Sequence, residues 1–89
     1  MIVMDRENLL ARGWSHVLST TNDVAELRAF CERMGAPSSA LQLGNRRWPH
    51  LDLKLEARDR ALATPGVRVF ERTSDMLRFL KALPLALKE

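Results

Sequence analysis

Apolar and polar residues alternate along two stretches of the chain, which is the pattern of a half-buried strand. Residues 14–19 alternate aromatic, polar and apolar side chains, so Trp14 and His16 are expected on one face of a strand. Residues 67–71 alternate β-branched and basic side chains and predict a second strand. The apolar run at residues 2–4 predicts a third, short strand, either at a sheet edge or within an ordered N-terminal arm that reaches residue 12.

Helical spacing of the apolar residues predicts three helices, near residues 24–34, 54–63 and 74–83. The first has the clearest limits. Asp23 and Glu26 form a capping box at its start, and Gly35 is a natural residue for its end. Between the first two helices, the pattern predicts only a helical turn and an extended segment that ends near residue 53.

Together these elements predict one small α/β domain over residues 1–89, with a two- to three-stranded, partly parallel sheet packed against about three helices. The strand–helix–helix–strand order makes the strands at 14–19 and 67–71 expected parallel neighbours. Ligands of parallel sheets bind at the carboxyl ends of the strands. Residues 85–89 are expected to form a loose tail.

The composition fits a soluble globular domain, with 46% hydrophobic and 28% charged residues among 89. The single cysteine, Cys31, excludes an intrachain disulfide and suits a reducing compartment. Its place on the first helix's apolar stripe predicts a core residue rather than a nucleophile. No apolar run approaches the roughly 18 residues of a membrane span, and the first residues lack the features of a signal peptide. We therefore expect a cytoplasmic protein with no membrane partner.

Basic residues are concentrated in the second half of the chain. Residues 1–43 hold four basic and five acidic residues, whereas residues 44–89 hold ten and six. Eleven of the fourteen basic residues are arginine, whose planar fork suits phosphate and carboxylate. This distribution indicates an anionic ligand or nucleic acid as a partner, with a solvated basic face as the alternative.

The stretch at residues 46–52 gathers most of the residues with chemical potential. Arg46 and Arg47 could bind phosphate and Trp48 could stack a base, as in proteins that bind single strands. The alternative is that Trp48 covers the core beneath arginine stems. We take as candidate ligand-binding residues Trp14, Arg46, Arg47 and Trp48.

His16, His50 and Asp52 are the candidate catalytic residues. Two imidazoles and a carboxylate can make an acid–base centre or an open metal site. No His-x-x-x-His or Cys-x-x-Cys motif supports a metal, so no cofactor is predicted and a divalent cation is only a minor option. A carboxylate that merely orients a histidine is the structural alternative. A nucleophilic Ser15 or Ser19 would lack the Gly-x-Ser-x-Gly elbow.

Several short motifs occur in a characteristic order along the chain. They are Trp14-Ser15-His16-Val17-Leu18-Ser19, Glu26-Leu27-Arg28-Ala29-Phe30, His50-Leu51-Asp52-Leu53 and Arg60-Ala61-Leu62-Ala63. Over residues 13–82 the chain resembles a family of short bacterial proteins known as a domain of unknown function. Members of that family show a Trp-Ser-His-Leu strand, a Glu-Leu-His-Ala-Phe helix and a His-Tyr-Asp turn.

The resemblance implies a shared fold and a polar site, to which Trp14, His16, His50 and Asp52 would belong. Two positions depart from the family pattern, since Leu51 replaces the tyrosine of the turn and Arg28 replaces the histidine of the helix. Any role of those two side chains in relatives is in doubt here. The resemblance implies no reaction.

Three functional classes follow from the sequence. The first is a module that binds an anionic ligand or nucleic acid. The second is a small hydrolase-type enzyme that uses His16, His50 and Asp52. The third is an accessory protein that forms a homodimer through residues 74–83, whose leucine-rich stripe a small monomer has difficulty covering.

Overall fold

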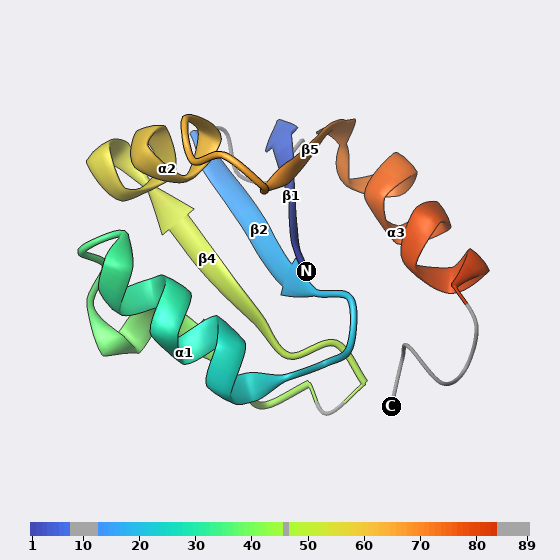
Figure 1. Ribbon diagram of the computed structural model, residues 1–89, viewed down its shortest axis with the longest axis horizontal. Helices are drawn as coiled ribbons and strands as arrows, with labels where there is room; N and C mark the ends of the chain where they lie inside the picture. Colours follow the sequence, from blue (N-terminus) through green and yellow to red (C-terminus); the bar gives the residue numbers. More distant parts are fainter. Residues whose placement is uncertain (8–12, 46, 84–89) are drawn as a thin grey trace.

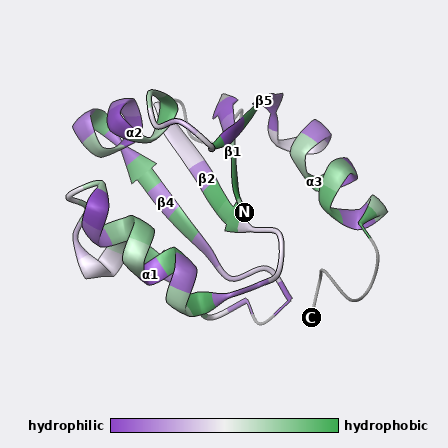
Figure 2. Cartoon of the chain, in the orientation of Figure 1, coloured by the Kyte–Doolittle hydropathy of each residue, from purple (hydrophilic) through white to green (hydrophobic). Residues whose placement is uncertain are grey.

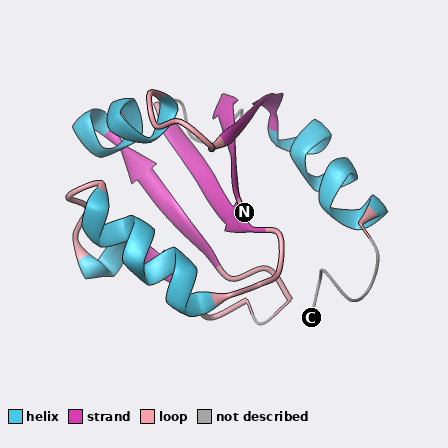
Figure 3. Ribbon diagram, viewed as in Figure 1, coloured by secondary structure: helices cyan, strands magenta, loops and turns pink. Residues whose placement is uncertain are grey.

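The computed structural model describes residues 1–7, 13–45 and 47–83. Within these ranges, the chain forms one five-stranded sheet, three α-helices and a single 3-10 turn (Figures 1 and 3). The elements, in chain order, are β1 Ile2–Glu7, β2 Trp14–Ser19, α1 Val24–Arg33, η1 Ser38–Ala40, β3 Leu41–Gln42, β4 His50–Lys54, α2 Leu55–Leu62, β5 Arg68–Arg72 and α3 Thr73–Ala82. The α/β class and the three helices are confirmed. Residue 46 and the tail predicted at 85–89 lie outside the described residues.

The strands lie in the order β3-β4-β2-β1-β5. Strand β1 pairs antiparallel with β2 and parallel with β5, and the β4 pairs with β2 and β3 are antiparallel. The prediction of two or three strands was therefore wrong, because β3 and β4 also join the sheet. The strands at 14–19 and 67–71 are not neighbours either, since β1 lies between them.

Strand β1 lies inside the sheet, and the prediction of an edge strand or N-terminal arm was wrong. Val3 and Met4 both have 0% of their surface exposed although they point to opposite faces. A short unbroken apolar run is typical of a strand that is covered on both faces. The helices of this chain supply that cover.

Helices α1 and α2 pack on one face of the sheet (Figure 1). The core between these helices and the sheet holds apolar side chains from each of the interior strands β1, β2 and β4. Its fully or nearly fully buried members are Ile2, Met4, Val17, Leu27, Phe30, Cys31, Met34, Ala40, Leu51, Leu53 and Ala61. Cys31 is buried there, and burial is the main cause that raises the pKa of its thiol. The prediction that Cys31 is a core residue is confirmed.

Helix α3 packs on the opposite face, mainly against β1 and β5. Met76 and Leu80 of α3 bury against Val3 and Leu18. In Figure 2, hydrophobic and hydrophilic residues alternate along α1 and α3, as expected of helices that bury one face. Part of the apolar stripe of α3 therefore lies in the chain's own core. The homodimer through residues 74–83 stays a prediction.

The helix limits follow local chemistry. The Asp23 carboxylate accepts a hydrogen bond of 3.2 Å from the Glu26 N–H, which confirms the predicted cap of α1, and Gly35 beyond its end has φ +71°. Helix α2 begins at Leu55 without a side-chain cap, and Leu55 has φ +53° with 73% of its surface exposed. None of the helices in the described ranges combines the length and apolar character that crossing a bilayer requires.

Two leucines on either side of the β4–α2 junction test this packing. Leu51 is 0% exposed, so Leu51→Ala should lower the free energy of unfolding by about 2–5 kcal/mol through lost burial and the cavity left behind. Leu55→Ala is the matched control and should change it by less than about 0.5 kcal/mol, because its side chain is exposed. Urea unfolding measures both, and equal losses would contradict the assigned core.

Candidate functional site

The candidate site is a row of polar side chains across three adjacent strands. His16 of β2 and Asp52 of β4 are paired opposite each other. On the other side of β2, Met4 pairs with Val17, so the next position in that register brings Asp5 beside His16. Because side chains alternate along a strand, these groups lie on the same face as α3. The register therefore gathers groups that lie far apart in the sequence.

The Asp5 carboxylate is buried, with 0% of the side chain exposed, and it holds His16 by two hydrogen bonds. One oxygen, Oδ1, accepts the His16 backbone N–H at 2.6 Å, and the other, Oδ2, lies 2.8 Å from the ring nitrogen Nδ1. The hydroxyl of Thr73, the first residue of α3, also donates to Oδ2. The carboxylate thus has partners on β2 and on α3.

These contacts shift both pKa values and favour the charged forms. Burial on its own would raise the pKa of Asp5, but hydrogen bonds from His16 and Thr73 outweigh burial and hold that pKa below its ordinary value of 3.8. The hydrogen bond to Asp5 raises the pKa of His16 above its ordinary value of 6.5. Burial opposes that rise, whereas the negative charges of Asp5 and Asp52 add to it.

The second histidine lies against the first. The rings of His16 and His50 meet edge to face, with centroids 5.6 Å apart at 67°. His50 Nδ1 lies 2.8 Å from the Trp48 carbonyl oxygen, and its Nε2 lies 3.4 Å from Asp52 Oδ1. The predicted trio of His16, His50 and Asp52 is therefore brought together, each with 22–32% of its side chain exposed.

The partners of the two rings define where protons reside. An ionised Asp5 and a carbonyl oxygen only accept hydrogen bonds, so Nδ1 of both His16 and His50 carries a hydrogen. On the His16 ring, Nε2 is then the nitrogen that gains or loses a proton. In this arrangement a fixed carboxylate orients one imidazole, and a second imidazole–carboxylate pair stands beside it, groups of the kind that general acid–base chemistry uses.

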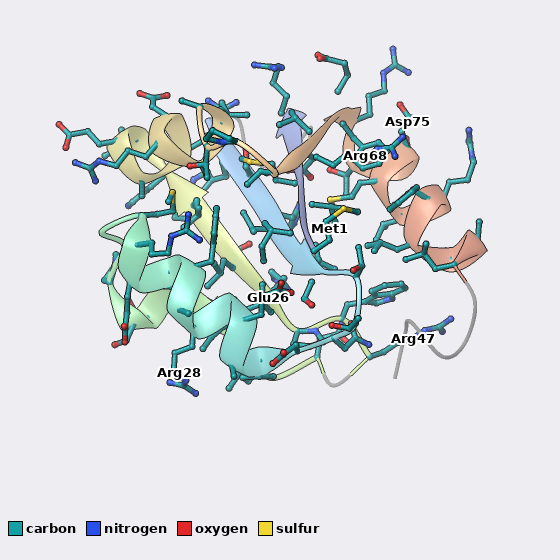
Figure 4. The ribbon with its side chains drawn as sticks, in the orientation of Figure 1. Met1, Glu26, Arg28, Arg47, Arg68 and Asp75 are labelled. Atoms are coloured by element: carbon teal, nitrogen blue, oxygen red, sulfur yellow. The ribbon has the colours of Figure 1, made fainter. Side chains whose placement is uncertain are left out.

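The predicted ligand-binding residues are spread more widely. Trp14 lies on the same strand face as His16, and the Lys54 ammonium stands 4.8 Å from the centre of its ring. Trp48 is half-buried and packs against the core beneath α3. Arg47 is exposed, its guanidinium 5.8 Å from the Trp48 ring, and Figure 4 shows it extending from the loop before β4. Arg46 lies outside the described residues.

The two serines considered as nucleophiles point away from the histidines. Ser15 and Ser19 alternate with His16 along β2 and therefore lie on the opposite face. The Ser15 hydroxyl accepts a hydrogen bond of 2.9 Å from Arg58 Nε, and the Ser19 hydroxyl accepts the backbone N–H groups of Thr21 and Asp23. Both hydroxyls have structural partners.

Metal binding was a minor option for this site. Among residues 1–7, 13–45 and 47–83, no group of three or more His, Cys, Asp and Glu side chains is arranged so that it could hold a metal ion. The nitrogens Nδ1 of His16 and His50 are each directed at a protein oxygen.

Sequence reasoning missed Asp5 and Thr73. Asp5 directly follows the apolar run 2–4, and neither it nor Thr73 is among the candidate site residues that the sequence indicates. A signal for Asp5 existed, since a lone acid at the end of an apolar run is unusual in a strand covered on both faces. No signal in the sequence indicated that it pairs with His16, because that contact depends on the β1–β2 register.

The pKa shifts predict opposite pH dependences for the two partners. Because the pKa of folded His16 lies above 6.5, its stabilisation is complete below pH 6.5 and is lost as pH rises through the raised value. The stabilisation from Asp5 is present above pH 3.8 and is lost as pH falls through its lowered pKa. An NMR titration of the His16 ring should give a pKa above 6.5 that falls in Asp5→Asn. An unchanged His16 pKa in that variant would contradict the pairing.

Comparisons with known proteins place the chain in one family. No curated protein matches the chain, and no solved structure matches it. Residues 2–82 match one protein family, and that range spans the described elements from β1 to α3. The chain therefore belongs to the family described as "Protein of unknown function (DUF4031)".

Proposed function

We propose that this protein is a small acid–base enzyme of the hydrolase type that acts on an anionic substrate. The observation that carries the proposal is the buried Asp5 carboxylate bound to both the backbone and the ring of His16. A carboxylate in this position fixes the tautomer and orientation of the imidazole and stabilises its protonated form. His16 is then the group that exchanges a proton with the substrate, and Asp5 is a positioning residue.

His50 and Asp52 supply the second half of the proposed centre. An acid–base reaction can use one group to remove a proton and a second group to return one. The two rings differ in their surroundings, since His16 is bound to a buried carboxylate and His50 to a carbonyl and the part-exposed Asp52. Neighbouring groups in unlike environments can take the two roles.

The charge of the chain supports an anionic substrate. The formal net charge of the chain is +3 with histidine neutral. At the row itself the Asp5 carboxylate balances a protonated His16, so the attraction for an anion comes from the basic residues of the chain around the site. Charge of one sign around a site raises the local concentration of substrates of the other sign.

Turnover of simple chromogenic substrates tests the proposal. We expect hydrolysis of at least one of three anionic esters, mono(4-nitrophenyl) succinate, 4-nitrophenyl phosphate and bis(4-nitrophenyl) phosphate, with kcat/KM reduced about 10²–10⁴-fold in His16→Ala. Asp59→Asn, which removes an exposed acid from α2, is the control and should keep full activity. Asp5→Asn should lower kcat/KM and should also shift its pH dependence toward lower pH, because His16 loses the partner that raises its pKa.

Two results would oppose the acid–base proposal. One is equal turnover by the unaltered protein and His16→Ala, which would place the activity elsewhere. The other is no turnover of the ester and both phosphate esters by a protein whose His16 pKa is raised as described.

Nucleic-acid binding is a second candidate, favoured by the exposed Arg47 guanidinium over the half-buried Trp48 ring. We expect Arg46→Ala combined with Arg47→Ala to weaken binding of a single-stranded oligonucleotide and to reduce its salt dependence by about two phosphate contacts. Fluorescence anisotropy at several salt concentrations measures both effects. The control is Arg28→Ala combined with Arg33→Ala, which removes two exposed arginines of α1 that are not part of this loop. Binding that does not change with salt concentration would rule out this candidate.

A further inference from the structure

A pocket opens beside β4 because strand β3 is short. Strand β3 pairs with β4 only through Leu41 with Leu51 and Gln42 with His50. The residues before β3 would lie opposite 52–54 if the pairing continued, but they form η1 instead. The sheet edge at 52–54 is therefore separated from η1, and the space between them is a hollow of about 260 Å³.

The lining of this hollow has an apolar part and a polar part. The apolar part comes from the connection after α1, from β4 and from the first turns of α2. Its residues are Ala36, Pro37, Ala40, Leu53 and Ala57. The polar part consists of Trp14, Ser39, Gln42, Asp52 and Lys54. A mainly apolar hollow with a few polar groups near its rim is the usual form of a small-ligand site, and this volume lies near the small end of the roughly 300–1,000 Å³ range.

The two charged residues of the lining differ in their contacts. Asp52 is the carboxylate of the lining, and it already faces His50 Nε2 at 3.4 Å. Lys54 is the cation of the lining, exposed and held over the Trp14 ring at 4.8 Å. One ammonium matches a single negative charge, whereas phosphate sites more often use arginine forks or several donors. The lining therefore favours a monoanion with an apolar body.

The hollow also adjoins the proposed catalytic row. Asp52 belongs to both, because it lines the hollow and is the cross-strand partner of His16. Asp52 and Lys54 are two residues apart on β4 and therefore share a strand face, so a ligand whose charge lies at Lys54 has its charged end on the side of the hollow that Asp52 also lines.

We infer that this hollow binds the substrate, and that the substrate class is a small organic carboxylate with an apolar or aromatic body. The carboxylate pairs with Lys54, the body fills the alanine-lined part, and the reacting bond lies toward Asp52. This inference rests on the proposed acid–base function, since it assigns the place that the substrate of that reaction occupies.

Binding of benzoate and of benzamide tests the inference, because the two have similar size and only benzoate is charged. In ¹H–¹⁵N NMR titrations we expect benzoate to shift the amide signals of Ala36, Ala40 and Leu53, with a Kd of the order of 1 mM, and benzamide to bind more weakly. Lys54→Met should weaken benzoate about fivefold, the size expected of one partly exposed ion pair, and leave benzamide unchanged. Lys81→Met on α3 is the charge-matched control.

A larger side chain at Ala57 tests the position of the body. Ala57→Leu should abolish binding of both probes while the remaining amide spectrum shows an intact fold. Equal affinity for benzoate and benzamide, or shifts of the same size in Lys54→Met and Lys81→Met, would overturn the assignment of the carboxylate. Absence of any shift at the lining residues up to about 20 mM would overturn the site itself.

The two proposals fail separately. His16→Ala keeps the whole lining of the hollow, so it should bind benzoate as the unaltered protein does. Benzoate binding without turnover of the chromogenic substrates would leave the pocket and remove the acid–base enzyme. Turnover that depends on His16, without benzoate binding, would leave the enzyme and remove this substrate class.

Discussion

The structure depends on the burial of one carboxylate, that of Asp5. An ionised group without exposure is unfavourable by several kcal/mol unless hydrogen bonds and an opposite charge compensate for it. Asp5 obtains that compensation from two neighbours at once, the backbone and ring of His16 on β2 and the hydroxyl of Thr73 at the start of α3. The same three contacts therefore join the centre of the sheet to the helix on one face and orient the ring of the candidate site.

The two faces of the sheet differ in chemical character. Helices α1 and α2 cover one face with an apolar core, and the polar residues of that face, such as Ser15, are satisfied by structural partners such as Arg58. On the α3 face, packing is concentrated at β1 and β5. On that face His16, His50 and Asp52 keep partial exposure, so solvent can reach the row of polar side chains.

The sequence predicted the parts that depend on local pattern. The helix beginning after Asp23 and the strand at 14–19 follow from capping and alternation. His16, His50 and Asp52 are candidates by residue type, and the β2–β4 register is what brings them together. The sheet was underestimated because β3 has only two residues and because the alternating pattern of β4 runs directly into a helical pattern, so that segment is predicted as extended but not as a strand of the sheet. Asp5 was missed because its role is created by pairing between strands, which no local pattern reveals.

The β1–β2 register is protected against slips of one strand along the other. A slip by one residue would turn Asp5 and His16 to opposite faces, because side chains alternate with a period of two. The carboxylate would then enter the apolar layer beneath α1 and α2 without its partner, at a cost of several kcal/mol. Apolar neighbours such as Val3 and Met4 could exchange places with far less loss. The polar pair thus specifies the alignment of the central strands, so that the two residues that orient the candidate site also favour a single strand register over its alternatives.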